Sequence, residues 1–394
     1  MNAQKINIVF VIRSIEGGGA QRQVIELIKG LDKTQFDITL VTFYDTNTSH
    51  SELNALGDVR WISLSKQGRW DLLPFFWRLW KTARLLKPQI LHGYMGISNE
   101  LCLLIGRLVK SRVVWGLRAS YVDFSQYDWA SRWSFRLSAW LSRYADLIIV
   151  NSQAGKVHYL AHGYKSRRMV VIPNGIDTER FHPDLQAGQQ VRAKWGVPPN
   201  TQLIGLVGRL DPIKDHPTFL QAAALLTKTH QDVRCVCVGG GGESYLQELQ
   251  TLARQLGLEQ YLIWTGPYMD MPAGYSAMDV VVSSSYGEGF SNVIAEAMAC
   301  EVPCVVTDVG DSAFIVGDTG IVVPPQDAKA LAVALCKLLR YSARERRKIG
   351  SAARVRIVSQ FTREQLVHNT TDALLKLMDT NIRTQVNDRS NYMK

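Results

Sequence analysis

A chain of 394 residues is longer than one ordinary hydrophobic core supports, so its length alone favours two domains. Apolar residues make up 46% and charged residues 20% of it, as in a globular protein, and no apolar run approaches the roughly 18 residues of a membrane span. The net charge of +10 would suit nucleic acid, but no nucleic-acid recognition motif accompanies it, and we expect no such partner.

The amino-terminal residues and the cysteines indicate a cytoplasmic protein. The chain begins Met1-Asn-Ala-Gln-Lys and passes directly into a strand-like run, so we expect no signal peptide. The cysteines lack the spacing of a zinc site, and Cys235 and Cys237 lie in an apolar, strand-like run, so we expect reduced thiols in the core. The six are Cys102, Cys235, Cys237, Cys300, Cys304 and Cys336.

Strand-like runs alternate with helical patterns along the whole chain, which predicts an α/β protein with parallel sheets flanked by helices. A turn-rich stretch, Pro173-Asn-Gly-Ile-Asp, divides the runs into two halves. The first half supplies strands at Ile6–Ile12, Phe36–Phe43, Val59–Leu64, Gln89–Leu91, Arg112–Trp115, Leu147–Val150 and Met169–Ile172. The second half supplies strands at Leu203–Val207, Val233–Val238, Tyr261–Thr265, Val280–Ser283, Cys304–Thr307 and Ile321–Val323.

The two halves predict two Rossmann-like domains, residues 1–175 and 191–362, joined by a linker at 176–190. Ligands in such sheets bind at the carboxyl ends of the strands. A last helix is expected over 363–379. Residues 380–394 are polar, and we predict a disordered tail there.

The positive charge is concentrated in residues 60–143, which hold 14 Lys and Arg against four Asp and Glu, a difference of +10. Eight of the ten tryptophans lie in the same segment. Tryptophan beside Lys and Arg is typical of surfaces that meet membrane headgroups, so contact with an anionic membrane surface is our preferred interpretation. An amphipathic helix with a tryptophan-rich core face is the alternative. The candidate residues are Arg78, Lys81 and Arg84, and then Trp129, Trp133 and Trp140 with Arg132, Arg136 and Arg143.

The most informative stretch is Glu288-Gly-Phe-Ser-Asn-Val-Ile-Ala-Glu296, which follows a strand-like run and opens a helix. Glu288 is expected in the loop, and Glu296 one to two turns into the helix. Between them, the backbone N–H groups near Ser291 and Asn292 form a helix N-terminus, which attracts phosphate. Two acceptors for sugar hydroxyls thus flank a phosphate site, as a nucleotide sugar requires. Two solvated surface glutamates are the alternative.

A second motif, Gly208-Arg209-Leu-Asp-Pro-Ile-Lys214, places two cations after a strand-like run. A departing diphosphate gains negative charge, and some transferases stabilise it with a metal held by an Asp-x-Asp motif, which this sequence lacks. The stabilising charge must then come from side chains and helix dipoles. Arg209 can form two parallel hydrogen bonds to the diphosphate, and Lys214 can act as a point charge. We expect no metal and no other cofactor.

Both motifs, with the following strand Val302-Pro-Cys-Val-Val-Thr, resemble the retaining glycosyltransferases of family 4, which have the GT-B fold. The resemblance covers nearly all of residues 5–378 and is most specific in 205–325. It implies two Rossmann-like domains that face a cleft, with the helix at 363–379 crossing back to the first domain. It also implies that the first domain binds the acceptor and the second binds the nucleotide sugar.

The resemblance assigns roles to individual residues of the second half. Glu296 would accept hydrogen bonds from the ribose hydroxyls, and Glu288 would contact the transferred sugar without acting as a covalent nucleophile. The implied reaction is a front-face displacement with retention, in which the leaving phosphate takes the acceptor's proton. Arg209 and Lys214 would bind the diphosphate. Further donor contacts are implied at Gly239, Phe290, Ser291 and Asn292.

Two glycine-rich turns complete the implied donor site. Gly239-Gly-Gly-Gly242 resembles the family's strand-to-helix turn, where glycine lets the backbone approach the nucleotide. In the first half, Gly17-Gly-Gly-Ala-Gln-Arg22 follows the first strand, and the resemblance places Gly18 and Gly19 beside the donor's phosphates and sugar. A simple tight turn is the alternative there.

Three residues of the first half are candidates for the acceptor or sugar pocket. Many relatives carry two histidines after the fourth strand, and this chain has His92 at the first place and Tyr94 at the second. Either side chain could therefore face the sugar. Arg118, in Trp115-Gly-Leu-Arg118, resembles an arginine that faces the cleft in bacterial polysaccharide transferases.

These expectations combine into a metal-independent retaining glycosyltransferase. It would move a hexose or N-acetylhexosamine from a nucleotide sugar, with UDP as the expected nucleotide, to a lipid-linked (polyprenyl) saccharide in O-antigen, capsule or exopolysaccharide synthesis. We expect it to be cytoplasmic and peripheral on the inner face of the cytoplasmic membrane. The alternatives are a UDP-sugar epimerase or a phosphorylase of the same fold, and a non-catalytic nucleotide- or lipid-binding adaptor.

Overall fold

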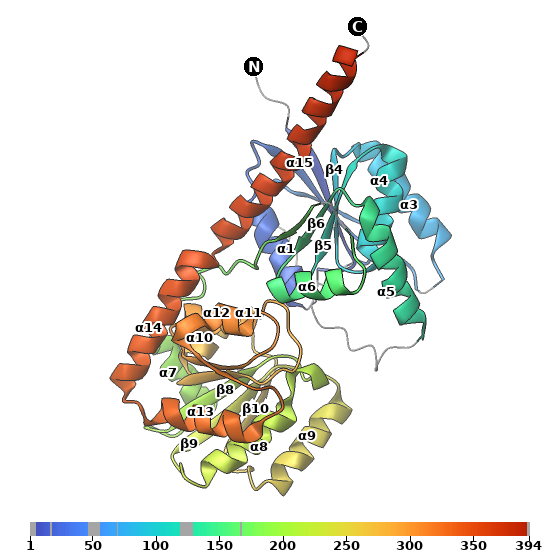
Figure 1. Cartoon of the computed structure of the whole chain (residues 1–394). Helices are drawn as coiled ribbons and strands as arrows, with labels where there is room; N and C mark the ends of the chain where they lie inside the picture. Colours follow the sequence, from blue (N-terminus) through green and yellow to red (C-terminus); the bar gives the residue numbers. More distant parts are fainter. Residues whose placement is uncertain are drawn as a thin grey trace. The chain divides into compact units, whose positions relative to one another are not determined.

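The computed structural model describes residues 5–15, 18–45, 56–68, 70–118, 129–165 and 168–391. The chain divides into two compact units, Met1–Gly175 with Arg363–Lys394, and Ile176–Thr362 (Figure 1). Each unit has a parallel β-sheet with helices on both faces, so the predicted α/β fold class is confirmed.

The sheet of the first unit has seven parallel strands in the order β3-β2-β1-β4-β5-β6-β7. Successive side chains of a strand point to opposite faces, so Val9 and Val11 of β1 join one core and Ile8 and Phe10 the other. Because both faces are buried, these strands are continuous apolar runs in the sequence. The strands are β1 (Ile6–Ile12), β2 (Phe36–Thr42), β3 (Arg60–Ser63), β4 (Ile90–Tyr94), β5 (Arg112–Leu117), β6 (Leu147–Val150) and β7 (Met169–Val171).

The helices of the first unit divide between the two faces of its sheet. Leu79, Leu103 and Ala139 bring three helices, α3, α4 and α5, onto one face, and these lie along one side of the unit (Figure 1). Leu27 and Leu374 bring α1 and α15 onto the other face. Among the described residues, none of the helices is both long and apolar enough to cross a bilayer. The helices are α1 (Gly19–Gly30), α3 (Leu73–Leu86), α4 (Ile97–Val109), α5 (Trp129–Leu141), the 3₁₀ helix η1 (Ser142–Tyr144), α6 (Gln153–Ala161) and α15 (Arg363–Asn391).

The sheet of the second unit has six parallel strands in the order β10-β9-β8-β11-β12-β13. They are β8 (Gln202–Val207), β9 (Val233–Val238), β10 (Leu262–Gly266), β11 (Val280–Ser283), β12 (Cys304–Thr307) and β13 (Ile321–Val323). One face is covered by α7 (Leu185–Lys194), α10 (Met271–Ser276), α11 (Asn292–Ala299), α12 (Ser312–Val316) and α14 (Ala343–Gln360). The other is covered by α8 (His216–Thr227), α9 (Glu243–Gln255) and α13 (Ala328–Arg340). The short 3₁₀ helices η2 (Pro212–Lys214) and η3 (Gly317–Thr319) lie in loops.

Every predicted strand is present, with ends that differ by up to three residues. The largest difference is in β4, which the sequence ends at Leu91 and the structure extends to Tyr94. His92 and Tyr94 pair in parallel register with Val114 and Gly116 of β5. The sheet ladder therefore continues through a polar residue, because strand formation depends on the neighbouring strand more than on side-chain type.

The structure corrects two predicted boundaries. The predicted linker, 176–190, belongs to the second unit and contains the start of α7, where the Asp184 carboxylate accepts a hydrogen bond from the Ala187 N–H. The helix α15 continues past residue 379 into the predicted disordered tail, because neither glycine nor proline interrupts residues 363–391. Residues 392–394 lie outside the described residues.

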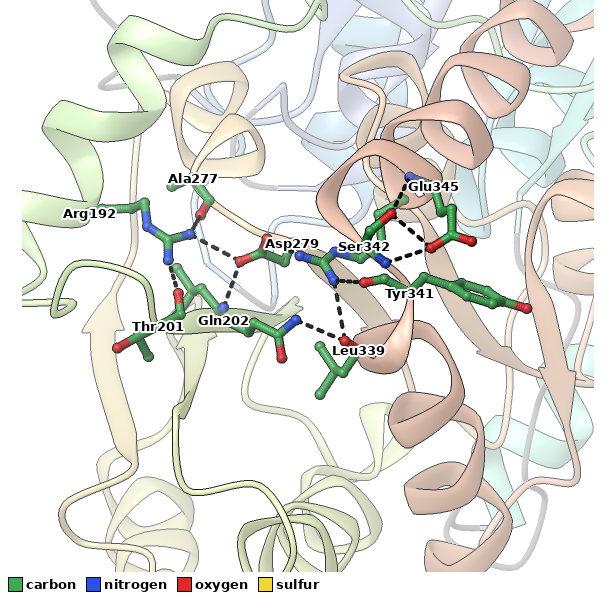
Figure 2. Close-up of polar contacts among 11 residues, drawn as sticks. Arg192, Thr201, Gln202, Ala277, Asp279, Leu339, Tyr341, Ser342 and Glu345 are labelled. Atoms are coloured by element: carbon green, nitrogen blue, oxygen red, sulfur yellow. Dashed lines mark hydrogen bonds and ion pairs between the residues drawn. The ribbon is translucent and has the colours of Figure 1, made fainter.

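An ionic cluster around Asp279 joins three elements of the second unit (Figure 2). Asp279 directly precedes β11, and its Oδ2 accepts hydrogen bonds from the Leu203 N–H of β8 (2.8 Å) and from Arg192 of α7 (3.2 Å). Its Oδ1 lies 3.3 Å from Arg346 of α14. One carboxylate therefore fixes two helices to the amino-terminal edge of the sheet, opposite the edge where ligands bind in such folds.

Candidate functional site

Three residues from two loops meet at the carboxyl ends of β8 and β11: Lys214 from the loop after β8, and Ser285 and Glu288 from the loop after β11. Lys214 Nζ lies 2.5 Å from Glu288 Oε1, and Ser285 Oγ donates a hydrogen bond of 2.8 Å to the same oxygen. The Lys214 and Glu288 side chains are 22% and 11% exposed, so little water screens this ion pair. A small cavity beside them is lined by Lys214, Ser283, Ser284, Ser285, Glu288 and Ser291, among others.

The loop that carries Lys214 is held by β11. Ser284 Oγ lies within hydrogen-bonding distance of the carbonyl oxygens of Lys214 (2.9 Å) and Asp215 (3.0 Å). Asp215 has a left-handed backbone with φ of 49°, and its carboxylate accepts a hydrogen bond from the Thr218 N–H at the start of α8. Such a backbone is unfavourable for residues other than glycine and persists only where its surroundings hold it. Ser284 and this cap therefore set the direction of Lys214.

The sequence analysis missed Ser284, Ser285 and Asp215. The signal for the serines was present, since Ser283, Ser284 and Ser285 follow the apolar residues of β11 at the carboxyl edge of a parallel sheet. For Asp215 the sequence offers no comparable signal, because a left-handed aspartate cannot be told from an ordinary loop aspartate without the backbone.

Arg209 lies on the same loop with its side chain 72% exposed. Its guanidinium lies 3.2 Å from the Asp211 carboxylate. An ion pair this exposed is weak, because water screens it and the long side chain loses entropy to form it. Arg209 can therefore exchange Asp211 for a more highly charged ligand.

Glu296 lies on α11, and only 4% of the residue is exposed. The hydroxyl of Tyr275, a fully buried residue of α10, donates a hydrogen bond of 2.9 Å to Glu296 Oε2. This contact fixes the orientation of the carboxylate before any ligand binds. The sequence analysis missed Tyr275, a single tyrosine that no motif distinguishes.

At the start of α11, Ser291 and Asn292 lie at the helix N-terminus, whereas Phe290 packs in the core. Ser291 precedes the helix and Asn292 is its first residue, and they are 4% and 8% exposed. The N–H groups of this first turn have no partners within the helix itself. Phe290 is a core residue, 5% exposed, with its ring centroid 5.4 Å from that of Phe361. A donor contact at Phe290 can therefore come from its backbone and not from its ring.

Two glycines allow loops at this edge to pack closely. Gly239 has φ of +147°, and a Cβ there would lie 1.8 Å from the carbonyl oxygen of Gly208. Glycine is therefore required because the backbone of residue 239 packs directly against the loop that carries Arg209. Gly310 has φ of +57°, and a Cβ there would lie 2.3 Å from the carbonyl oxygen of Glu288. The sequence analysis predicts a role for Gly239 and missed Gly310.

In the first unit, His92, Tyr94 and Arg118 form a buried cluster at the end of β4. His92 is fully buried with its ring 5.0 Å from that of Phe10, and neither ring nitrogen has a hydrogen-bond partner among the described residues. Burial, assisted by the charge of Arg118, lowers the pKa of His92 to about 3. His92 is thus a neutral packing residue.

Tyr94 and Arg118 contact each other. Tyr94 is fully buried, its hydroxyl accepts a hydrogen bond from Arg118, and the Arg118 guanidinium lies 4.7 Å from the ring centroid. Burial raises the pKa of the Tyr94 hydroxyl. Arg118 also donates to Asn174 Oδ1 at 3.1 Å, and it is 8% exposed. His92 and Tyr94 are both fully buried in this arrangement, and the prediction that one of them faces the sugar stays a prediction.

The glycine turn of the first unit is only partly described. Gly18 has an extended backbone and immediately precedes α1, whose first residue is Gly19. Neither glycine has a side chain to cover the N–H groups of the first turn. Gly17 lies outside the described residues, and the donor contacts at Gly18 and Gly19 stay predictions.

The cysteines are core residues and do not form a metal site with other side chains among the described residues. All six cysteines are free, and all but Cys336 are buried. Burial raises the pKa of Cys235 to about 12, which leaves it an unreactive core thiol. In the part of the chain that the structure describes, no group of three or more His, Cys, Asp or Glu side chains could hold a metal ion.

Two family models match the chain. The model "Glycosyltransferase Family 4" matches residues 17–180, and "Glycosyl transferases group 1" matches residues 201–341. The first match contains the turn of Gly18 and Gly19, and the second contains the Lys214–Glu288 pair and Glu296.

Curated proteins match over part of the chain. The D-inositol 3-phosphate glycosyltransferase of Corynebacterium jeikeium is 36% identical over 207 residues, which are 50% of this chain and 49% of that protein. The protein of the same name from Mycobacterium bovis is 35% identical over 241 residues, 59% of this chain and 48% of that protein. The chain thus spans about half the length of the curated relatives it matches.

Solved structures match over nearly the whole chain. Anabaena Alr3699/HepE, crystallised with UDP and glucose, superposes with a TM-score of 0.83 at 22% identity over 94% of this chain and 99% of that one. WaaG, a glycosyltransferase involved in lipopolysaccharide biosynthesis, gives 0.72 at 16% identity over 93% and 99%. At these identities the likeness shows the fold, which is the GT-B fold of glycosyltransferases.

Proposed function

The chain belongs to the family 4 glycosyltransferases, and from this premise we propose that it transfers a hexose or N-acetylhexosamine from a UDP-linked donor to a lipid-linked saccharide, with retention. The observation that carries the proposal is the contact between Lys214 and Glu288 near the start of α11. A cation, an acceptor for sugar hydroxyls and a set of helix N–H groups then share one edge of one sheet. A nucleotide sugar requires all three.

Support for UDP as the nucleotide comes from the neighbours in fold, since Anabaena HepE was crystallised with UDP and with UDP-glucose. In the proposed complex the Glu296 carboxylate accepts hydrogen bonds from the ribose hydroxyls. Its fixed orientation on Tyr275 favours this role, because an acceptor that is already positioned loses little entropy on binding. Glu288 accepts a hydrogen bond from a hydroxyl of the transferred sugar.

The negative charge of the departing diphosphate is stabilised by protein groups in this proposal. Lys214 and Arg209 supply two positive charges from one loop, and the first turn of α11 supplies N–H groups and the positive end of a helix dipole. The low exposure of Lys214 strengthens its interaction with a phosphate. Metal independence is proposed from the same residues, since they take the role that a metal has in transferases with an Asp-x-Asp motif.

The proposed displacement takes place on one face of the sugar. The acceptor oxygen bonds to the anomeric carbon on the side from which the phosphate oxygen leaves, and that phosphate oxygen takes the acceptor's proton. Glu288 is a poor candidate for a covalent nucleophile, because Lys214 and Ser285 both bind its Oε1. Glu296 is equally poorly placed, since Tyr275 binds it and it is 4% exposed.

The lipid-linked acceptor is proposed from the exposed tryptophan and arginine side chains of the first unit, which suit a membrane surface. A polyprenyl-linked saccharide in O-antigen, capsule or exopolysaccharide synthesis fits such a surface, and WaaG offers a neighbour in fold that is involved in lipopolysaccharide biosynthesis. The free cysteines favour a reducing compartment, so we place the reaction at the cytoplasmic face of the membrane.

A second acceptor is favoured by a specific observation. The matched curated relatives are named for inositol 3-phosphate, a soluble phosphorylated polyol. Transfer to such an acceptor uses the same donor site, so the two candidates differ only in the first unit. Offering each acceptor with the same donor separates them directly.

The test is a transfer assay with isotope-labelled donors. A panel of UDP- and GDP-sugars is incubated with the protein and a membrane extract, and the products are identified by mass. With a labelled UDP-sugar, we expect the label to appear in the lipid fraction. The Glu296→Ala variant should transfer less label than the unchanged protein, because it binds the donor more weakly. Release of an epimerised free sugar nucleotide would identify an epimerase, and binding without any product would identify an adaptor. Product anomeric configuration, read by NMR, tests retention.

A further inference from the structure

The strongest feature that the donor site does not use is an exposed aromatic surface on α5 and the start of α3. Large apolar side chains that are half or more exposed are concentrated here, and Trp70, Leu73 and Trp129 are more than three-quarters exposed. Tryptophan is costly to leave in water, and such a group of exposed residues marks an interaction site. These side chains form two sets, Trp129, Trp133, Leu137 and Trp140 on α5, and Trp70, Leu73 and Trp77 on and just before α3, which together we call the aromatic surface.

Helical geometry shows that the α5 tryptophans are not core residues. At 3.6 residues per turn, Trp129, Trp133, Leu137 and Trp140 fall within an arc of about 80°. The half-buried Phe135 and the buried Ser138 lie on the other side, roughly opposite that arc. The alternative of a tryptophan-rich core face is therefore wrong for α5.

The inner side of α5 is fixed to the rest of the unit. Ser138 donates a part-buried hydrogen bond to Glu100 of α4 and accepts a buried one of 3.0 Å from the Tyr164 hydroxyl. Phe135 packs 5.4 Å from the Tyr164 ring. Ser138 and Phe135 thus fix one side of α5 to the rest of the unit, and this packing leaves the tryptophans on the opposite side exposed to solvent.

Basic residues border the aromatic surface. Arg132 and Arg136 are exposed and fall in a narrow arc next to the tryptophans. Arg143, in η1, is also exposed, and its Nε donates a hydrogen bond of 2.9 Å to the Trp140 carbonyl oxygen. On α3, Lys81 lies 5.1 Å from the Trp77 ring centroid. Arg78, which the sequence predicts in the same basic row, is instead paired with Asp71.

We infer that the aromatic surface inserts into the headgroup region of an anionic lipid bilayer, with the tryptophans in the interface and Arg132, Arg136 and Lys81 against lipid phosphates. The choice of lipid over a second protein rests on charge, because residues 60–143 carry the whole net charge of +10. Two copies of such a surface would repel each other, whereas an anionic membrane attracts it. The inference rests on the proposed function for its lipid-linked acceptor, which is argued from the same exposed side chains, but it does not involve the donor-site residues Lys214, Glu288 and Glu296.

Vesicle sedimentation tests the inference. Vesicles of phosphatidylcholine with about one third phosphatidylglycerol should bind the protein at about 0.15 M salt, and vesicles of phosphatidylcholine alone should bind it much less. The variant Arg132→Ala/Arg136→Ala should bind on the order of twentyfold less, since each arginine near the surface contributes about fivefold. Trp129→Ala/Trp133→Ala should lose binding to a similar or greater degree.

Matched controls come from the second unit. Arg344→Ala/Arg347→Ala removes two exposed arginines, and Met269→Ala removes an apolar side chain that is 84% exposed. Both controls should bind vesicles like the unchanged protein. Circular dichroism on heating shows whether each variant is folded, which is expected because every substituted residue is exposed.

Three outcomes would overturn the inference: no binding to anionic vesicles, equal binding to neutral ones, or a dimer in sedimentation that Trp129→Ala/Trp133→Ala disperses. The last would show that a second copy covers the surface. The result is separable from the proposed function, because transfer to a short water-soluble acceptor should survive Trp129→Ala/Trp133→Ala. Vesicle binding without any sugar transfer would instead refute the proposed function and leave this inference standing.

Discussion

Lys214 Nζ contacts Glu288 Oε1 at 2.5 Å across 74 residues of sequence, and this pair joins two motifs that the sequence presents separately. The loop after β8 supplies the cation, and the loop before α11 supplies the carboxylate. Neither side chain is more than 22% exposed, so the pair is established by the fold itself. A ligand that enters here meets a positive charge and an acceptor whose positions are already set.

Arg209→Ala should reduce turnover on the order of a hundredfold, the scale of losing one group that stabilises developing charge. The fold should be unaffected, because the side chain is 72% exposed and its ion pair is with Asp211 on the same loop. Initial rates and a thermal melt measure the two effects. Arg254→Ala, which removes an exposed arginine from α9, is the control and should change neither. Unchanged turnover in Arg209→Ala would remove this residue from the site.

Ser284→Ala should lower kcat more than it raises the KM for the donor. The hydroxyl holds the carbonyl groups of Lys214 and Asp215, so its loss frees the Lys214 loop without removing a group that touches substrate. Ser284→Thr retains the hydroxyl and should recover most of the rate. Stability should fall by about 1 kcal/mol in the alanine variant, the usual contribution of one hydrogen bond. A threonine variant as slow as the alanine variant would contradict this positioning role.

Asp279→Ala should destabilise the second unit by about 2 kcal/mol. Removing one partner of a buried ionic cluster costs about 3–5 kcal/mol, and the figure is reduced here because the Asp279 side chain is 24% exposed. Urea titration measures the difference. Activity at low temperature should persist, since the cluster lies at the amino-terminal edge of the sheet (Figure 2). Asp318→Ala, an acidic residue in η3, is the control.

His92 should make folding stability depend on pH below about 6.5. Burial lowers its pKa to about 3 in the folded protein, whereas the unfolded chain keeps a pKa near 6.5. Between these values the unfolded state binds the proton, so stability falls by up to about 1.4 kcal/mol for each unit of decreasing pH. His92→Leu should lose this part of the acid dependence, and His368→Leu, in which the ring is 73% exposed, should keep it. Parallel acid dependences for His92→Leu and the unchanged protein would contradict the buried neutral state of His92.

Much of the fold could be predicted from the sequence because both sheets are parallel and buried on both faces. Such strands appear as apolar runs, and every predicted one is present. The boundary at 176–190 could not be predicted. Asp184, which precedes α7, is one polar residue among several in the sequence, and its role as the helix cap is visible only in the hydrogen bond that it accepts from the Ala187 N–H.

The candidate site was predictable only in part. Charged residues in short motifs, such as Lys214 and Glu288, carry a signal in the sequence. Tyr275 contacts Glu296 across 21 residues of sequence, and Ser284 contacts Lys214 and Asp215 across 70 and 69, and no local pattern marks such partners. The burial of His92 and Tyr94 was likewise not predicted, since both residues lie inside β4, which the sequence ends too early.

Calorimetric titration of UDP, in EDTA, tests the central claim most directly. Protein cations at the edge of the sheet that carries Lys214 and Glu288 are proposed to bind the diphosphate, so the unchanged protein should bind UDP without metal. Lys214→Met should bind at least about tenfold more weakly, the loss of about 1.4 kcal/mol, while Lys228→Met, which changes an exposed lysine next to α8, should bind normally. Equal affinity of Lys214→Met and the unchanged protein, or binding that chelation abolishes and magnesium restores, would contradict the account.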